Sequence, residues 1–386
     1  MKNKNTLLVL LKTMLWVYII LCIVIASLNY GVASLNYGVA SKAPEKAKEF
    51  ITWSWHFYEN WVKTIFIVVC SYLTMKILSP ANTTMRRKNL IGFSVSALAI
   101  HIIAPFFLHN SEVYFFTMPL PWTTAPIQLL DPSSSFYGSR APIWGLFGVS
   151  AVLVFYWCYT TLVLLGTLLL GRRWQCATLC LFNGFASEVF APAFPLIGRK
   201  KTPDEKMMRT FSVLRWLFLA IALFFTVFFL LHIAGVQTLL DSGIIGKIET
   251  YKYLATELMT AMFFWVAFIG RGYCYYCPLG TILGLLSKVA GQRIITNHTK
   301  CVQCARCNVA CPMAIDIMGK AKDGVSVTSL RCVGCGHCVD ACPTANLSYS
   351  TRFLSLVNKP RALVEQMETT LPPAVADETT RNQIKG

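Results

Sequence analysis

The sequence predicts a polytopic α-helical membrane protein that ends in a small, cysteine-rich α+β segment. Three observations lead to this fold class. Of the 386 residues, 55% are hydrophobic and 14% are charged, whereas soluble domains carry about 25% charged residues. Six apolar stretches are long enough to cross a bilayer, for which about 20 residues suffice. Eight of the 15 cysteines fall between residues 301 and 342 at regular spacing.

The six predicted spans follow one another along the first 270 residues. They cover about 6–28, 61–79, 90–109, 143–170, 211–234 and 253–270. Lys2 and Lys4 precede the first span and small residues follow it, so a cleaved signal peptide is the alternative interpretation of this stretch. Its apolar run is long for a signal peptide, which favours an uncleaved span.

The net charge is +17, and many of the basic residues lie in short stretches between the apolar runs, at 86–88, 172–173 and 199–201. These stretches form no continuous basic face, so nucleic acid is not an expected partner. Basic residues are enriched in the cytoplasmic loops of membrane proteins. We therefore expect a multi-pass protein of the cell inner (cytoplasmic) membrane, in contact with the lipid bilayer. This orientation places the N-terminus, the cysteine-rich segment and the C-terminus in the cytoplasm, where thiols stay reduced.

The cysteine-rich segment contains the motif C-x2-C-x2-C-x3-C-P twice. This run is typical of bacterial ferredoxins with two [4Fe–4S] clusters, in which the fourth cysteine of each copy ligates the cluster of the other copy. Zinc also binds paired C-x2-C motifs, but two complete runs with both prolines favour clusters. The predicted ligands are Cys301, Cys304, Cys307 and Cys342 for cluster 1, and Cys332, Cys335, Cys338 and Cys311 for cluster 2.

Four further cysteines, which we call the boundary cysteines, form two pairs at the predicted inner ends of the fourth and sixth spans. They are Cys176 with Cys180, and Cys274 with Cys277. Both pairs are expected at the same depth, on the side of the cysteine-rich segment. Four thiolates that meet there would bind a third metal centre, such as copper. Reduced, packed cysteines and a redox-active dithiol are the alternatives.

Two histidines near the outer ends of spans are candidates for a quinone pocket. His109 lies near the end of the third span and His232 near the end of the fifth. Ionisable residues within membrane spans mark functional sites by default. Hydrogen bonding to a quinone, axial ligation of a haem and plain helix packing remain open for these side chains. The sequence contains no C-x-x-C-H motif, which disfavours haem.

The paired cysteine motifs, together with the two-cluster segment behind them, resemble the NapH-type membrane ferredoxins over residues 140–345. The NosR-type, MauN-type and CcoG-type membrane iron–sulfur proteins are related. The resemblance implies a quinol dehydrogenase membrane subunit that passes electrons from the quinone pool to a partner reductase or electron carrier. CcoG-type relatives imply copper reduction instead. The chain departs from the NapH pattern at Leu181, where proline is usual, in the shorter Cys274–Cys277 spacing and in having six predicted spans rather than four.

Three parts are therefore predicted: a membrane domain over 1–290 with paired cysteine motifs at 171–180 and 270–278, a two-cluster bacterial ferredoxin-like domain over 291–350, and a tail of low order over 351–386. The predicted function is membrane-bound iron–sulfur electron transfer between the quinone pool and a partner redox enzyme. Metal handling, cofactor assembly and redox-sensing regulation are the alternatives. No nucleophile, acid–base pair, dinucleotide fingerprint or phosphate loop is evident, so we assign no catalytic residue.

Overall fold

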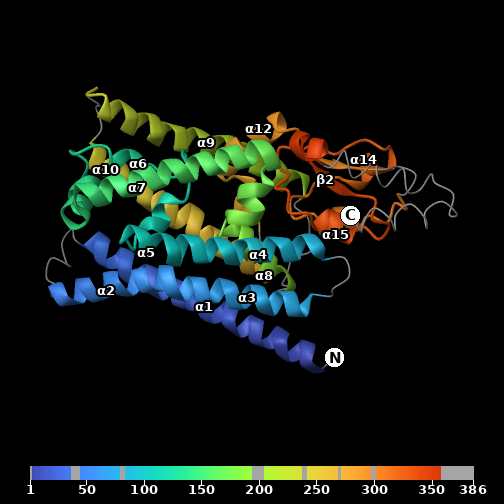
Figure 1. Cartoon of the computed structure of the whole chain (residues 1–386), viewed down its shortest axis with the longest axis horizontal. Helices are drawn as coiled ribbons and strands as arrows, with labels where there is room; N and C mark the ends of the chain where they lie inside the picture. Colours follow the sequence, from blue (N-terminus) through green and yellow to red (C-terminus); the bar gives the residue numbers. More distant parts are fainter. Residues whose placement is uncertain are drawn as a thin grey trace, which may run out of the picture.

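The computed structural model describes residues 2–35, 44–78, 83–193, 204–236, 241–267, 271–296 and 301–357. Its helices form an elongated bundle, and the cysteine-rich segment lies at one end of that bundle (Figure 1). The helices are α1 (Lys2–Leu35), α2 (Glu45–Phe57), α3 (Lys63–Ile77), α4 (Thr84–Leu98), α5 (Ala104–Leu108), α6 (Ala125–Gln128), α7 (Ser135–Leu170), α8 (Asn183–Ala193), α9 (Glu205–Ile233), α10 (Ser242–Lys252), α11 (Thr260–Ala267), α12 (Pro278–Val289), α13 (Arg306–Ala310), α14 (Met318–Lys322) and α15 (His337–Ala341).

Shorter helical turns and one small sheet complete the described structure. The π-helical turns are η2 (Tyr58–Val62), η3 (Ala99–Ile103), η5 (Gln175–Leu179) and η6 (Tyr253–Met259), and the 3₁₀ turns are η4 (Val113–Phe116) and η7 (Gly272–Tyr275). The strands are β1 (Arg293–Ile295) and β2 (Ser348–Ser350).

Four of the described helical segments are long and apolar enough to cross a membrane: Lys4–Leu28, Thr84–Leu108, Ser135–Leu170 and Glu205–Ile233. Large apolar side chains are exposed on their outer surfaces, among them Phe147 and Val213. Such surface is expected where a protein meets lipid rather than water. These four segments overlap the predicted spans 6–28, 90–109, 143–170 and 211–234.

The other two predicted spans are helical but are not among these four. Residues 61–77 of the predicted span 61–79 fall in a continuous helical run of α2, η2 and α3, which carries the charged residues Glu59, Lys63 and Lys76, and residue 79 lies outside the described part of the chain. The span 253–270 forms η6 and α11, which include a shorter apolar helix, Ala255–Val266. Residues 268–270 lie outside the described part of the chain.

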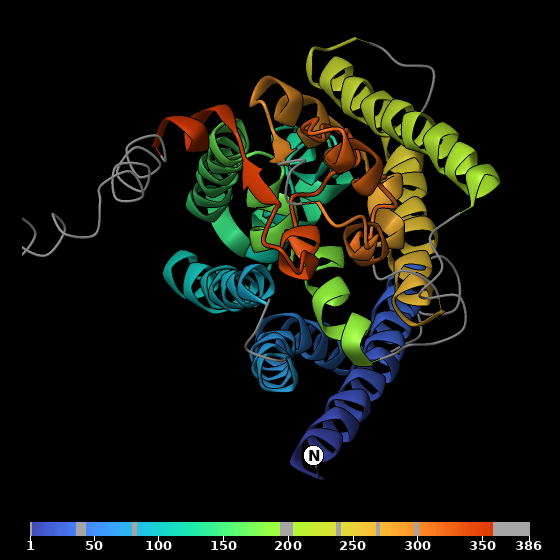
Figure 2. The ribbon, with the colours of Figure 1, turned by 90° about the vertical axis from the view of Figure 1, so that its right-hand side faces the viewer.

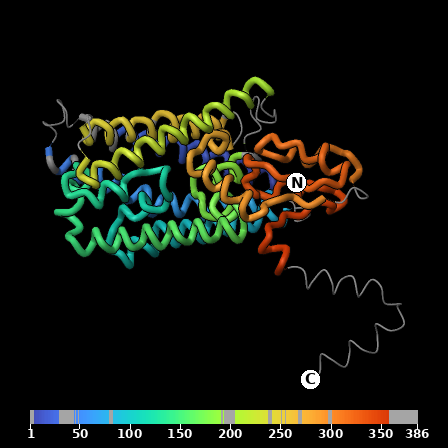
Figure 3. Tube along the Cα trace, turned by 90° about the horizontal axis from the view of Figure 1, so that it is seen from above, coloured from blue at the N-terminus to red at the C-terminus, as the bar shows by residue number. Residues whose placement is uncertain are grey.

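The direction of the helices brings several chain segments to the end that carries the cysteine-rich segment. The start of α1, the start of α4 and the end of α7 lie there (Figure 1). Seen from that end, the cysteine-rich segment lies in front of the helices (Figure 2), and a view from above shows it extending beyond the bundle (Figure 3). Residues separated by more than 100 positions can therefore contact one another at this junction.

The end of α7 positions the first pair of boundary cysteines. α7 stops at Gly171, whose φ of 73° is in the left-handed region that glycine readily adopts. A Cβ at this position would lie 2.5 Å from the hydroxyl of Tyr349, which itself donates a hydrogen bond to the carbonyl of Leu170. The chain then turns inward into η5, which carries Cys176.

A two-stranded antiparallel sheet joins the two ends of the cysteine-rich segment. Arg293 pairs with Ser350 and Ile295 with Ser348. Ordered structure continues beyond the predicted boundary at residue 350, because the Thr351 hydroxyl donates to the carbonyl of Leu169 over 2.7 Å and residues 352–357 are helical. The remainder of the predicted tail, from residue 358, lies outside the described residues.

Candidate iron–sulfur site and its contacts with the helical domain

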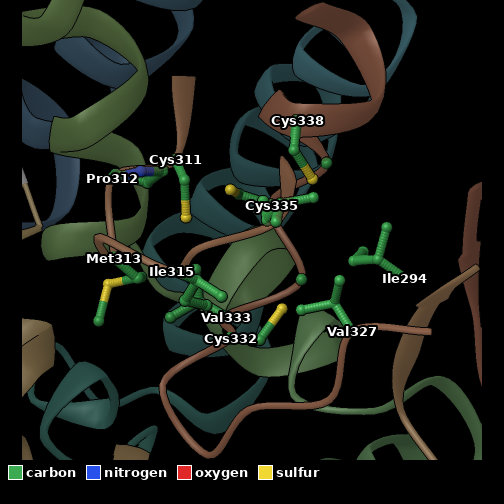
Figure 4. Close-up of a pocket in the computed structure, with 13 residues that line it drawn as sticks. Ile294, Cys311, Pro312, Met313, Ile315, Val327, Cys332, Val333, Cys335 and Cys338 are labelled. Carbon is green, nitrogen blue, oxygen red and sulfur yellow. The ribbon is translucent and has the colours of Figure 1, made fainter. Parts of the chain in front are cut away.

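Two cavities in the cysteine-rich segment are each lined by four cysteines. The inner cavity, which is the one in contact with the helical domain, and the outer cavity each have a volume of about 20 Å³. Cys311, Cys332, Cys335 and Cys338 line the inner cavity, and their sulfur atoms lie around it in Figure 4. Cys301, Cys304, Cys307 and Cys342 line the outer cavity. The structure therefore brings together the same two sets of four cysteines that the motif spacing predicts.

The backbone of both cysteine loops is tightly turned. Gly334 and Gly336, on either side of Cys335, have φ values of 66° and 78°. In the outer loop, Gln303 and Ala305 adopt the left-handed region at 51° and 57°, which is costly for residues other than glycine. These turns wrap each loop around its cavity, and the short helices α13 and α15 carry Cys307 and Cys338.

The donors and the lining fit an iron–sulfur cluster in each cavity. Cysteine thiolates are the ligands of [4Fe–4S] clusters, and apolar side chains such as Ile294, Met313 and Val327 complete the inner lining. Within the residues that the structure describes, no three His, Cys, Asp or Glu side chains converge closely enough to hold a single metal ion. Four cysteine sulfurs around one cavity match the ligand set of a [4Fe–4S] cluster.

The two cavities differ in exposure and in their contacts. Cys335 and Cys338 of the inner set are buried, whereas Cys304 of the outer set is exposed. Side chains from the helical domain, and Gln292 between α12 and β1, donate hydrogen bonds to backbone carbonyls of the inner loop, residues 330–338. The pairs are Arg172 Nη1 to Leu330 at 3.3 Å, Gln292 Nε2 to Cys332 at 2.9 Å, Arg173 Nη1 to Gly334 at 3.2 Å and Asn89 Nδ2 to Cys335 at 2.9 Å.

A buried carboxylate on α8 links the inner loop to the helical domain. Glu188 is fully buried, and its carboxylate lies 2.8 Å from Nε2 of His337, 3.1 Å from Nε of Arg86 and 3.8 Å from Nη2 of Arg271. Burial alone would raise the pKa of Glu188, but the His337 imidazole and the two guanidinium groups bring that pKa below its ordinary value. Glu188 is therefore an anion that compensates buried cations.

A second carboxylate joins the cysteine-rich segment to α4. Asp340 accepts hydrogen bonds from the backbone amides of Met85 and Arg86, each at 3.0 Å. Thr83, at the N-cap position of α4, makes no capping hydrogen bond with its side chain. Asp340 thus takes the place of a local N-cap, where a negative charge is also favourable. Sequence reasoning missed both Glu188 and Asp340; an acid within the largely apolar α8 was the available signal.

The boundary cysteines lie in the helical domain next to two buried arginines. Cys176 and Cys274 are buried, and electrostatic interactions link Cys274 with both Cys176 and Cys180. Arg172 Nε donates to Cys176 Sγ over 3.2 Å, and Arg271 Nη1 donates to the Cys176 carbonyl over 3.0 Å. The remaining boundary cysteine, Cys277, accepts a hydrogen bond at its sulfur from the backbone amide of Gly280 over 3.3 Å. The structure therefore gathers both pairs of boundary cysteines at one place.

The two predicted histidines lie in different surroundings. His232 Nδ1 is 3.0 Å from a carboxylate oxygen of Asp131. His109 is exposed at the end of α5, with a φ of 48°.

A larger cavity that sequence reasoning missed lies within the bundle and has a volume of about 50 Å³. Neither His109 nor His232 lines it. It is mainly aromatic, with one ion pair in its wall, Lys63 Nζ to Glu59 Oε2 at 2.7 Å. The lining residues are Tyr18, Cys22, Trp55, Glu59, Lys63, Phe66, Leu181, Phe182, Phe185, Ala186, Phe190, Tyr253, Leu258 and Trp265. Because these residues come from distant parts of the chain, no local sequence pattern predicts the cavity.

Comparisons with known proteins support the assignment of the C-terminal site. The family model described as "4Fe-4S dicluster domain" matches residues 293–343. The uncharacterized protein MJ0749 of Methanocaldococcus jannaschii is 27% identical over 153 residues, which are 39% of this chain. The chain spans about half, 56%, of that relative's length. No solved structure matches the chain significantly. The chain therefore combines a C-terminal 4Fe–4S dicluster domain with four candidate membrane-spanning helices.

Proposed function

We propose that this protein is a membrane-bound iron–sulfur electron-transfer protein that carries two [4Fe–4S] clusters and connects the quinone pool with a partner redox enzyme. The observation that carries the proposal is the pair of four-cysteine cavities, the inner of which is held against an apolar helical bundle. Bound clusters would supply one-electron chemistry. The protein's own residues fix the position of the inner site and leave the outer site accessible at Cys304.

We place the quinone site in the aromatic cavity of the bundle. Its mostly apolar, aromatic wall with a few polar groups is typical of binding sites for small molecules. Phe182, in its wall, packs edge-on against Tyr273, which directly precedes the boundary cysteine Cys274. The cavity therefore borders the region between the bundle and the inner four-cysteine site. A pocket at His109 or His232 is the alternative location.

The full-length protein in lipid nanodiscs tests this function. A short-chain quinol should bleach the iron–sulfur absorbance, or a quinone should restore it after chemical reduction. Lys63→Met should weaken the response to quinol about tenfold, the effect of one lost charged hydrogen bond. Lys76→Met is the matched control, since Lys76 is on the same helix but exposed. Intact clusters that respond to neither quinol nor quinone would rule the function out.

The topology that we propose has six spans, with the N-terminus and the cysteine-rich segment in the cytoplasm of a cell with an inner membrane. An even number of crossings, whether four or six, places the N-terminus and the cysteine-rich segment on the same side of the membrane. This agrees with Figure 1, in which both lie at the same end of the bundle. A C-terminal reporter that is active only in the cytoplasm tests the side. Protease protection of the segments around residues 61–79 and 253–270 distinguishes six spans from four.

Metal handling at the boundary cysteines is a second candidate function. The observation that favours it is the gathering of four thiols beside Arg172 and Arg271, which donate hydrogen bonds to the sulfur and the carbonyl of Cys176. Thiolates are suitable ligands for Cu(I). Stoichiometric copper binding that Cys176→Ala and Cys274→Ala abolish would support this role. The control is Cys158→Ala, at an exposed position of α7. Equal copper contents in all variants would exclude the role.

A further inference from the structure

Two arginines at the junction between the bundle and the cysteine-rich segment are among the most deeply buried side chains described. Arg271 is 0% and Arg172 1% exposed. The Nε and Nη2 atoms of Arg271 have no hydrogen-bond partner within the described structure, and its Nη2 reaches Glu188 only at 3.8 Å. A buried cation with unused donors is costly unless a negative group lies close to it. The positive charge at this junction therefore favours an additional negative charge nearby.

The inner cavity lies next to this excess of positive charge. Electrostatic interactions link Arg271 with Cys335, and both Arg172 and Arg271 with Cys332. Arg172 and Arg173 also donate hydrogen bonds to carbonyls of the inner loop. Arginines outnumber carboxylates at this junction. The cations include Arg86, Arg172, Arg173, Arg271 and Arg331, and the anions are Glu188 and Asp340.

The outer cavity has a different electrostatic environment. Arg306 lies between two of its cysteines, and Lys320 and Lys322 lie on α14, which contributes to its lining. All three side chains are exposed. Exposed charges are screened by water and salt, whereas buried charges act at a lower effective dielectric constant. The nearby carboxylates Asp316 and Asp323 reduce the positive charge further.

We propose that Arg172, Arg173 and Arg271 raise the reduction potential of the inner cluster above that of the outer cluster. The inference rests on the proposed function, in that both cavities hold clusters. Reduction adds one negative charge, and net charge, hydrogen bonding and solvent exposure set cluster potentials. Burial of the inner site disfavours the added charge, but the buried guanidinium groups and the unused donors of Arg271 favour it more strongly.

This asymmetry gives the two sites different roles. When one electron moves from the outer to the inner site, the outer cluster is oxidised and the inner cluster is reduced by the same electron. The higher inner potential favours that distribution. An electron that a soluble donor supplies at the exposed outer site would thus be held mainly by the inner cluster, beside the helical bundle.

A potentiometric EPR titration of the full-length protein in detergent tests the inference. Cys304→Ser alters an outer ligand and so identifies the outer signal. We expect the other signal to have the more positive midpoint potential. Arg173→Gln should shift only this inner midpoint in the negative direction, and Arg173→Lys should retain most of the wild-type value. Arg271→Gln should shift it further.

Lys320→Gln, at an exposed site near the outer cavity, is the control for a general loss of positive charge and should leave the inner midpoint unchanged. The iron content shows whether each variant is folded and contains its clusters. If Arg271→Gln loses iron, the comparison of Arg173→Lys with Arg173→Gln still tests the inference. An inner midpoint equal to or below the outer one would overturn the inference, as would equal shifts of both signals in Arg173→Gln. A wild-type protein without any cluster signal would instead overturn the proposed function itself.

Discussion

The imidazole of His337 lies 2.8 Å and 2.9 Å from the two carboxylate oxygens of Glu188, although the two residues are 149 positions apart in the chain. His337 stands between Cys335 and Cys338 of the inner cavity, and Glu188 belongs to α8 of the helical domain. One contact therefore connects a loop that lines the inner site with the apolar bundle. This relationship explains why the inner site has a fixed position relative to the bundle.

Replacement of Glu188 should strongly destabilise this junction. Glu188→Ala leaves the buried Arg271 and the half-buried Arg86 without their shared counterion, and loss of one partner of a buried ion pair costs about 3–5 kcal/mol. We expect the clusters to be lost at a lower temperature than in the wild type. The decay of iron–sulfur absorbance on heating measures this temperature. Glu205→Ala is the control, because Glu205 and its partner Arg209 are exposed and their pairing contributes little. Similar thermal profiles for both variants would contradict the role of Glu188.

Asp340→Ala should loosen the start of α4. The substitution removes the acceptor for the amides of Met85 and Arg86, and loss of a capping side chain costs about 1 kcal/mol. Hydrogen exchange at residues 84–87 should accelerate, while exchange near the start of α9, which Asp204 caps, should not change. Unchanged exchange at both helix ends would show that Asp340 does not cap α4.

The cross-pairing of the cysteine motifs has a specific consequence for iron content. Cys311→Ala changes the first motif but should abolish the inner signal, because Cys311 lines the inner cavity. Cys342→Ala changes the second motif but should affect the outer signal. Each variant should retain about half of the iron that two clusters contain. EPR spectra and iron analysis measure both effects, and Cys158→Ala serves as the control. Loss of the signal from the same motif in each variant would contradict the cross-pairing.

Gly336→Ala should disturb the inner loop. Its φ of 78° is unfavourable for alanine by about 1–2 kcal/mol, and the added Cβ would lie 2.7 Å from the Cβ of Met85. We expect reduced iron retention at the inner site. Gly138→Ala is the matched control within α7, since nothing lies within 4 Å of an added Cβ there. A fully loaded, thermally unchanged Gly336→Ala protein would show that the loop can relax.

Much of the architecture was accessible from local patterns. Hydropathy over windows of about 20 residues indicated the four segments that are long and apolar enough to cross a membrane. The spans predicted at 61–79 and 253–270 stay predictions, since their described residues form helices that are more polar or shorter. Cysteine spacing grouped the eight cysteines in the two sets that line the cavities, because three ligands of each set lie within seven residues of one another.

The sequence by itself determined the cysteine loops and the apolar helices, since both depend on residues close together in the chain. Only the tertiary structure decided what surrounds them. Glu188, Asp340 and Arg172 acquire their roles from partners that are more than 100 residues away. The aromatic cavity likewise needs side chains from both ends of the helical domain. Such contacts depend on how helices pack, and packing is a property of the whole bundle rather than of any single segment.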